Sequence, residues 1–198
     1  NTWSTIWNGI HQCYMFQESL KQVSNEYVTD EMKKQYLAES NFLIAYYHFL
    51  SMRSYGPTMI IRSVIDLETP ISGFPERSSI DEVVAFINEK LDEAMSEGGL
   101  PTTWSGKDYG RATRLAALAL KSRVYLYAAS PLYNGNTEMY ADFRSPLDGR
   151  QLIAQEKSQA KWEISATQTK YAIDEVEKAK FHLYHDADAG EPSDAKPG

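Results

Sequence analysis

Two short polar segments carry the side chains best suited to bind a ligand. They span residues 102–109 and 133–140 and combine aromatic rings with amides, hydroxyls and carboxylates. This composition suits sugars, because pyranose faces stack on rings while hydroxyl groups need polar partners. The candidate ligand-binding residues are Trp104, Tyr109, Tyr133, Asn134, Asn136 and Tyr140. Two alternatives stay open: Tyr133 and Tyr140 only cover helix ends, or the loop aromatics contact a partner protein, since aromatics are enriched in interfaces.

No catalytic motif accompanies these segments. The sequence has no nucleophile elbow, phosphate-binding loop, zinc-protease motif or dinucleotide fingerprint. The acid pairs Asp81-Glu82 and Asp92-Glu93 lie in an amphipathic stretch. We interpret them as a solvated helix face rather than as the two carboxyl groups of a glycosidase. We therefore expect a protein that is not an enzyme and has no cofactor.

One cluster near the end of the sequence has ligand types that metals use. His182 and His185 are followed by Asp186, Asp188 and Gly190. The spacing is a poor match to a zinc site, and the calcium-loop pattern lacks a downstream bidentate Glu. We interpret the histidines as a helix-end cluster, which is favourable to the helix dipole, and expect no metal site.

Charge excludes some partner classes. The chain of 198 residues has 20 basic and 27 acidic residues, a net charge of −7, and a pI near 5.1. An acidic surface argues against nucleic acid and anionic lipid as partners, but not against neutral sugars. The single cysteine, Cys13, cannot form an intramolecular disulfide and is expected to be a small buried hydrophobe.

The spacing of apolar residues predicts an all-α chain, with no convincing strand beyond a short extended stretch at Thr58–Ile61. Two long connections, residues 57–79 and 131–157, contain Pro and Gly turn signals and are expected to be loop insertions. The five predicted helices span about Ser4–Ser24, Glu31–Tyr55, Ile80–Met95, Ala112–Ala129 and Ser158–Lys180.

Start and stop signals fix two of these helices. Ser79 and Glu82 have the spacing of a capping box, in which each side chain satisfies a free backbone N–H. Gly56-Pro57 ends the second helix, because proline lacks the N–H that continues a helix. Apolar residues surround the second helix almost completely, which indicates a central buried helix.

Three charged residues interrupt apolar surroundings. They are Glu39 in the second helix, and Arg111 and Arg123 at or in the fourth. A charge in an apolar region is usually paired. We therefore expect Glu39 to form an ion pair with either Arg111 or Arg123.

The second and fourth helices can be overlaid with an offset of 74 residues. The overlay aligns Ala38 with Ala112, Ala45 with Ala119, and Leu50 with Val124. Paired helices with small residues at their crossings are typical of tetratricopeptide repeats, although the standard repeat is about 34 residues long. The pattern favours tetratricopeptide-like antiparallel helix pairs.

Longer stretches resemble one known family. The segment Tyr109–Gly135 (YGRATRLAALALKSRVYLYAASPLYNG) resembles the signature helix and exit loop of SusD/RagB-like proteins. Four further stretches agree in the family's order, and the resemblance covers roughly Trp3 to Tyr184. They are Trp3–Glu18, Glu39–Pro57, Pro75–Ala94 and Lys161–Ile173. The sequence departs from the family at Tyr14, where Asn is usual, and at Ile44, where Arg is usual.

The resemblance implies a function as well as a fold. SusD/RagB-like proteins are outer-membrane lipoproteins that face outward, bind oligosaccharide or in some members peptide, and cap a TonB-dependent, SusC-like transporter. It implies a SusD-like helical region over residues 1–184, and a loop over 185–198 that leads to a C-terminal part outside this sequence. The lipid-bearing N-terminal cysteine would also lie outside it.

A second function stays open. A tetratricopeptide-type scaffold binds peptides or partner proteins in its concave groove and needs no chemistry of its own. The helical pattern fits both readings. The segment Tyr109–Gly135 and the two long connections favour the nutrient-binding reading, because a plain scaffold needs neither insertion.

Overall fold

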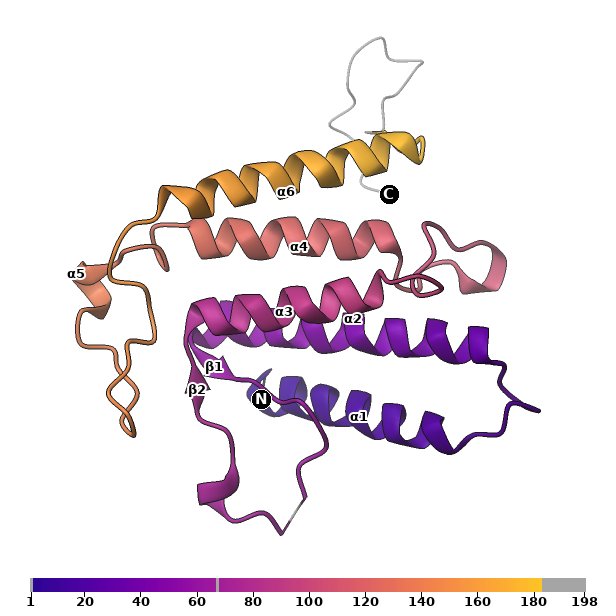
Figure 1. Cartoon of the computed structure of the whole chain (residues 1–198), viewed down its shortest axis with the longest axis horizontal. Coiled ribbons are helices and arrows are strands. Elements are labelled where there is room, and N and C mark those ends of the chain that lie inside the picture. Colours follow the sequence, from indigo (N-terminus) through magenta and orange to yellow (C-terminus); the bar gives the residue numbers. More distant parts are fainter. Residues whose placement is uncertain (1, 67, 183–198) are drawn as a thin grey trace.

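The computed structural model describes residues 2–66 and 68–182, and its architecture is all-α (Figure 1). The helices are α1 (Thr2–Gln22), α2 (Asp30–Tyr55), α3 (Ile80–Ala94), α4 (Arg114–Ala129), α5 (Thr137–Tyr140) and α6 (Gln159–Lys178), with 3₁₀ turns η1 (Ile71–Gly73) and η2 (Gly106–Asp108). The long helices are antiparallel to their neighbours in the chain (Figure 1). The predicted tetratricopeptide-like helix pairs are thus confirmed. None of the described helices is long and apolar enough to cross a membrane.

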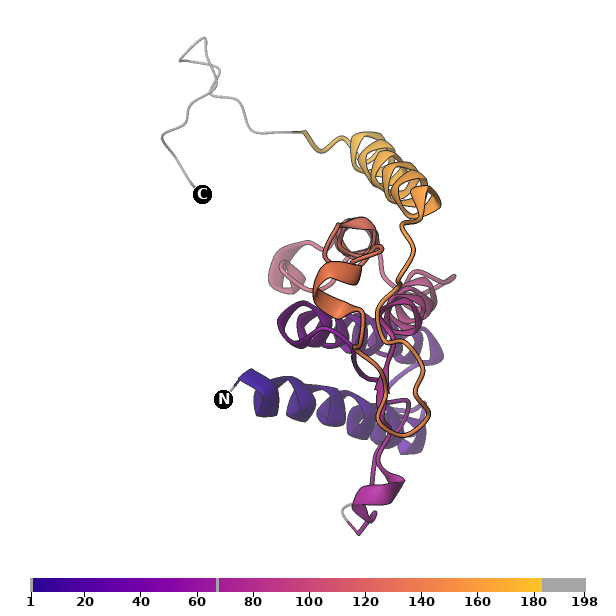
Figure 2. The same cartoon turned by 90° about the vertical axis from the view of Figure 1, so that its left-hand side faces the viewer.

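The helices stack in chain order. Each long helix packs mainly on the one before it and the one after it, from α1 through α2, α3 and α4 to α6. Seen end-on in Figure 2, α3 and α6 lie on one side of the stack, and α2 and α4 on the other. The connections therefore emerge at two opposite ends (Figure 1). Residues 95–113 lie at one end and residues 130–158 at the other.

Local signals set the helix ends within two residues of the positions that the sequence predicts. Ser79 and Glu82 form the expected capping box at α3. Gly56 ends α2 with a φ of 71°, a conformation that favours glycine because it has no Cβ. The fourth helix begins at Arg114, two residues later than expected, because the Thr113 side chain accepts the N–H of Ala116 and serves as the N-cap.

The structure has one pair of very short strands, of which only the first lies in a stretch that was predicted to be extended. β1 (Thr58–Met59) lies within the expected extended stretch and pairs antiparallel with β2 (Arg77–Ser78). The second strand was not predicted, because two residues are too few to show an alternating pattern. The pair closes the connection of residues 57–79 at its base.

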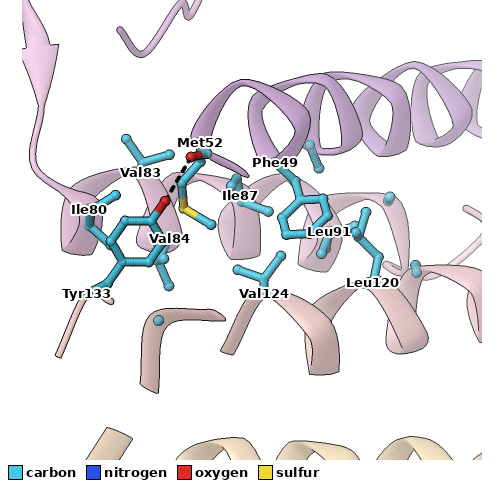
Figure 3. Packing of buried hydrophobic residues seen from close by; sticks show 14 of the residues in the cluster. Phe49, Met52, Ile80, Val83, Val84, Ile87, Leu91, Leu120, Val124 and Tyr133 are labelled. Carbon is cyan, nitrogen blue, oxygen red and sulfur yellow. Dashed lines mark hydrogen bonds between the residues drawn. The ribbon is translucent and has the colours of Figure 1, made fainter. Parts of the chain in front are cut away.

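Two apolar clusters lie on opposite sides of α2. The first joins α2, α3 and α4, and Figure 3 shows Phe49, Met52, Leu91 and Val124 packed within it. The second joins α1 and α2 to the start of the following connection and to one residue of α3; it contains Ile6, Ile10, Cys13, Tyr14, Ile44, Ile61 and Phe86. Cys13 is buried as expected. Because α2 is covered from both sides, its predicted role as the central helix is confirmed.

His48 of α2 is fully buried between these clusters, and its ring is hydrogen-bonded at both nitrogens. Nδ1 lies 2.8 Å from the carbonyl oxygen of Ile44, and Nε2 lies 3.3 Å from the backbone N–H of Ile61. The carbonyl needs a donor and the N–H needs an acceptor, so the ring is the neutral Nδ1–H tautomer. Burial lowers the pKa of His48 to about 4, with Lys90 and Arg62 adding to the effect and the bond to Ile44 opposing it.

Acid is therefore expected to destabilise the fold through His48. Because its pKa is lower in the folded chain than the ordinary 6.5, the unfolded chain binds the extra proton first. Stability should fall as pH drops from about 6.5 to about 4, by up to roughly 3 kcal/mol from this residue. Urea unfolding at a series of pH values checks this. His48→Gln should flatten the slope, and an unchanged slope in that variant would contradict the assignment.

Candidate ligand-binding site

The loop that precedes α4 holds Trp104 in a fixed position. Its indole Nε1 donates to the carbonyl oxygen of Ala112 at 2.7 Å, and the ring is half-buried. The loop is also tied at its base, where the N–H of Arg114 donates to the carbonyl of Pro101 at 2.8 Å. Trp104 is thus a rigid ring at the end of the helical stack.

Arg111 organises the surroundings of this ring. Its guanidinium lies 4.1 Å from the centroid of the Trp104 ring and 5.7 Å from that of Tyr36. Nη2 donates to one oxygen of Glu39, and Nε donates to the other at 3.3 Å. Nη1 donates to Asp108 at 2.9 Å. The bonds to Glu39, more than any other interaction, raise the pKa of Arg111, which stays a cation. The predicted ion pair of Glu39 is confirmed, and Arg111 is the partner.

A cavity of about 410 Å³ opens beside Trp104. Tyr109 reaches it with a side chain that is 85 % exposed. Thr102, Thr103 and Thr113 supply hydroxyl groups, while Leu115 of α4 and Val176 and Phe181 at the end of α6 form an apolar wall. Two rings, three hydroxyls and an apolar wall can hold a ligand that has both flat apolar faces and polar edges, as sugars do.

The residues at the other end of α4 have structural contacts. Tyr133 is buried and donates its hydroxyl hydrogen to the carbonyl of Met52 at 3.2 Å (Figure 3). Asn134 is also buried. Its amide donates to the carbonyls of Ala129 and Ser158, and its Oδ1 accepts the N–H of Ser158 at 2.7 Å. These two side chains hold the end of α4 against α2 and the start of α6.

The rest of that loop is more accessible. Asn136 caps α5 by accepting the N–H of Met139 at 3.1 Å, and the half-buried Tyr140 ring lies 5.9 Å from Phe143. A second cavity of about 420 Å³ lies between this loop and α6. Its lining includes Asn136, Glu138, Lys157 and Trp162. Trp162 was missed as a site residue, because its spacing fits the packing face of a helix equally well.

The six predicted site residues therefore form two groups and not one. α4 has 16 residues, which corresponds to about 24 Å, and the two loops lie at its opposite ends (Figure 1). Trp104 and Tyr109 share the first cavity. Asn134 and Asn136 border the second, while Tyr133 and Tyr140 pack against the first apolar cluster.

Neither the acid pairs nor the histidines form a reaction centre in the part of the chain that the structure describes. Asp81 of α3 pairs with Lys161 of α6, and Asp92 of α3 pairs with Lys121 of α4, both at 2.5 Å, so these acids join helices. No group of three or more metal-ligating side chains occurs within residues 2–66 and 68–182. The other residues that were considered as metal ligands and rejected, His185, Asp186, Asp188 and Gly190, lie outside the described residues.

Comparison with known proteins identifies related sequences and structures. Residues 1–126 match a family model for SusD-like proteins, described as starch-binding and associating with the outer membrane. No curated protein matches the chain significantly. Among solved structures, BT4246 is similar with a TM-score of 0.84 and 35 % identity, covering 93 % of this chain and 31 % of that protein.

Two further solved structures are more distant. A laminarin-binding SusD-like protein is 25 % identical with a TM-score of 0.57, over 65 % of this chain and 26 % of its own. Surface glycan-binding protein A from Bacteroides fluxus is 28 % identical with a TM-score of 0.54, over 74 % and 31 %. The match thus covers 26–31 % of the length of these three solved proteins.

The Arg111 network should contribute measurably to stability. Arg111→Gln removes the ion pairs with Glu39 and Asp108 and the stacking on Trp104, and is expected to lower the free energy of unfolding by about 1–2 kcal/mol, since these groups are partly solvated. Arg123→Gln is the matched control. Arg123 is exposed on α4 without an ion pair among the described residues, so its loss should stay within about 0.5 kcal/mol. Equal losses in the two variants, measured by urea unfolding, would contradict the role of Arg111.

Proposed function

The chain belongs to the SusD-like family, and from this membership we propose that the protein binds oligosaccharide or polysaccharide at the cell surface and delivers it to a TonB-dependent, SusC-like outer-membrane transporter. The protein would act by capture and transfer, without chemistry of its own. Two of the similar solved proteins are glycan-binding by name, one for laminarin, which supports a glycan as the ligand class.

The cavity beside Trp104 is the observation that carries this proposal. Tyr109 offers an exposed ring, while Trp104 is fixed by Ala112 and Arg111 and needs no rearrangement to receive a ligand. A preformed aromatic site reduces the entropy lost on binding. The threonine hydroxyls around it provide donors and acceptors for sugar hydroxyl groups.

The second cavity is a further candidate contact. Asn136 and Trp162 border it beside the charged side chains of Glu138 and Lys157. The Asn134 contacts join this loop to α6, so a ligand would meet a preformed surface here too. We include Asn136 and Tyr140 of this loop in the proposed site. Tyr133 and Asn134 hold the loop in position through their contacts with α2 and the start of α6.

The family also implies where the protein works. We propose a lipid-anchored protein on the extracellular face of the outer membrane, where a captured glycan can pass directly to the transporter. The acidic net charge of −7 is compatible with neutral glycans, whose recognition depends on stacking and hydrogen bonds rather than on counter-charge.

Glycan binding should depend on Tyr109 more than on an equally exposed tyrosine elsewhere. In isothermal titration of the full-length protein against plant and host polysaccharides, we expect one glycan class to bind. Tyr109→Ala should weaken it roughly tenfold, or about 1.4 kcal/mol, the scale of one ring contact. Tyr27→Ala is the control, because Tyr27 is 77 % exposed and lies in the turn between α1 and α2, outside the cavity.

Other outcomes separate the alternatives. If a glycan binds and Tyr109→Ala behaves like Tyr27→Ala, the function stands and the site lies elsewhere. If no polysaccharide binds but peptides do, the tetratricopeptide-type scaffold is the better reading. Binding of neither class would count against both functions.

A further inference from the structure

A groove between α1 and α2 has the same mixture of side chains as the proposed sugar site. Its cavity volume is about 440 Å³. The rings of Phe16, Tyr36 and Tyr47 line it, together with the polar side chains of Gln12 and Glu39. None of the six candidate site residues lies in this groove, because its residues belong to regular helices and not to loops.

The groove is preformed by close packing of the two helices. A Cβ at Gly9 would lie 2.6 Å from Cζ of Tyr47, so the tyrosine ring rests directly on the backbone of α1. Below it, the Ser40 hydroxyl donates to the carbonyl of Cys13 at 3.2 Å. The Gln17 amide also joins the helices by donating to Asn41 at 2.9 Å. These contacts fix the distance between the helices and hence the width of the groove.

The groove and the Trp104 cavity are linked by the ion pair between Glu39 and Arg111. Glu39 lines the groove, Arg111 lines the Trp104 cavity, and the two side chains form one ion pair. The Tyr36 ring contacts the guanidinium on one side and lies edge-on to Phe16 on the other, with ring centroids 6.5 Å apart. A series of aromatic rings thus runs from Trp104 past Arg111 to Tyr36 and Phe16.

We infer that the α1–α2 groove is a second subsite for the same ligand, and that the ligand is an extended chain of neutral sugars crossing the Arg111–Glu39 pair. This inference rests on the proposed glycan-binding function. One sugar unit cannot contact both cavities at once, because they lie on either side of the ion pair. A chain that reaches both gains affinity, because its second contact is made within the same molecule.

The charges favour a neutral chain. Arg111 is the one cation among the described residues that line the two cavities, and its charge is already balanced by the two carboxylates of Glu39 and Asp108, which accept three of its five N–H donors. A carboxylate or sulfate on the glycan would meet the negative side chain of Glu39 without a free positive partner. Neutral hydroxyl groups can instead donate to Glu39 and accept from Gln12.

Chain length and one matched pair of variants test the inference. Neutral oligosaccharides of increasing length, prepared from the polysaccharide that binds, are titrated into the full-length protein. Phe16→Ala removes a groove ring that is 44 % exposed. Met15→Ala is the control, since Met15 is the preceding residue, is 42 % exposed and does not line the groove.

The parent protein should bind long oligosaccharides more tightly than short ones. Phe16→Ala should reduce the affinity for long chains roughly tenfold, to near that of short chains, and leave the short chains unaffected. Leu43→Ala, on the α2 side of the groove, should act in the same direction, and Met15→Ala should match the parent. Unchanged thermal midpoints would show that the variants are folded.

Several results would overturn the inference. Affinity that does not rise with length, or a Phe16→Ala variant that matches Met15→Ala on long chains, would remove the groove from the site while leaving the proposed function intact. Tighter binding of a uronic-acid oligosaccharide than of its neutral counterpart would refute the neutral ligand class. If the polysaccharide binds the parent but its oligosaccharides do not bind at any length, this inference fails and the proposed function stands. If neither the polysaccharide nor its oligosaccharides bind, the proposed function fails, and this inference fails with it.

Discussion

The position of α2 between two apolar clusters is the constraint on which the rest of the structure depends. The polar groups that this covering buries cannot bond to water, so each must find a partner inside the protein. Ser40 bonds to the backbone of α1, and His48 bonds to the connection that follows α2. These bonds fix the position of α2 relative to both neighbours. That placement determines the groove between α1 and α2 and the position of the Glu39 carboxylate, which pairs with Arg111.

The helices could be predicted from the sequence because their causes are local. The capping box at Ser79 and the stop at Gly56 act within a few residues. The Arg111–Glu39 pair could be reduced to two possibilities, because a charge in apolar surroundings needs a partner. Which loop aromatics face solvent could not be predicted. Tyr133 is buried because its hydroxyl reaches Met52, 81 residues away, whereas Tyr109 lies in a similar loop without such a partner and is exposed.

The candidate site also has a part that could be predicted from the sequence and a part that could not. Trp104 and Tyr109 were identified from composition, yet the aromatic rings of α1 and α2 were not, because helical spacing assigns such rings to the core. Gly9 lets the Tyr47 ring lie against the backbone of α1, and Phe16 lines the same groove with a side chain that is 44 % exposed. The departures from the family pattern at Tyr14 and Ile44 do not touch this groove. Both residues are buried in the cluster between α1 and α2.

The stacking of helices in chain order has a consequence for how the protein folds. Each long helix packs mainly on its neighbours in the chain, so most contacts close short loops and the contact order is low. Chains of this type fold quickly and can nucleate at any adjacent pair. As the polypeptide is synthesised, the α1–α2 pair can form before the later helices, and α3, α4 and α6 can each then dock on the helix that precedes it. Exposed apolar intermediates are then short-lived, which limits aggregation.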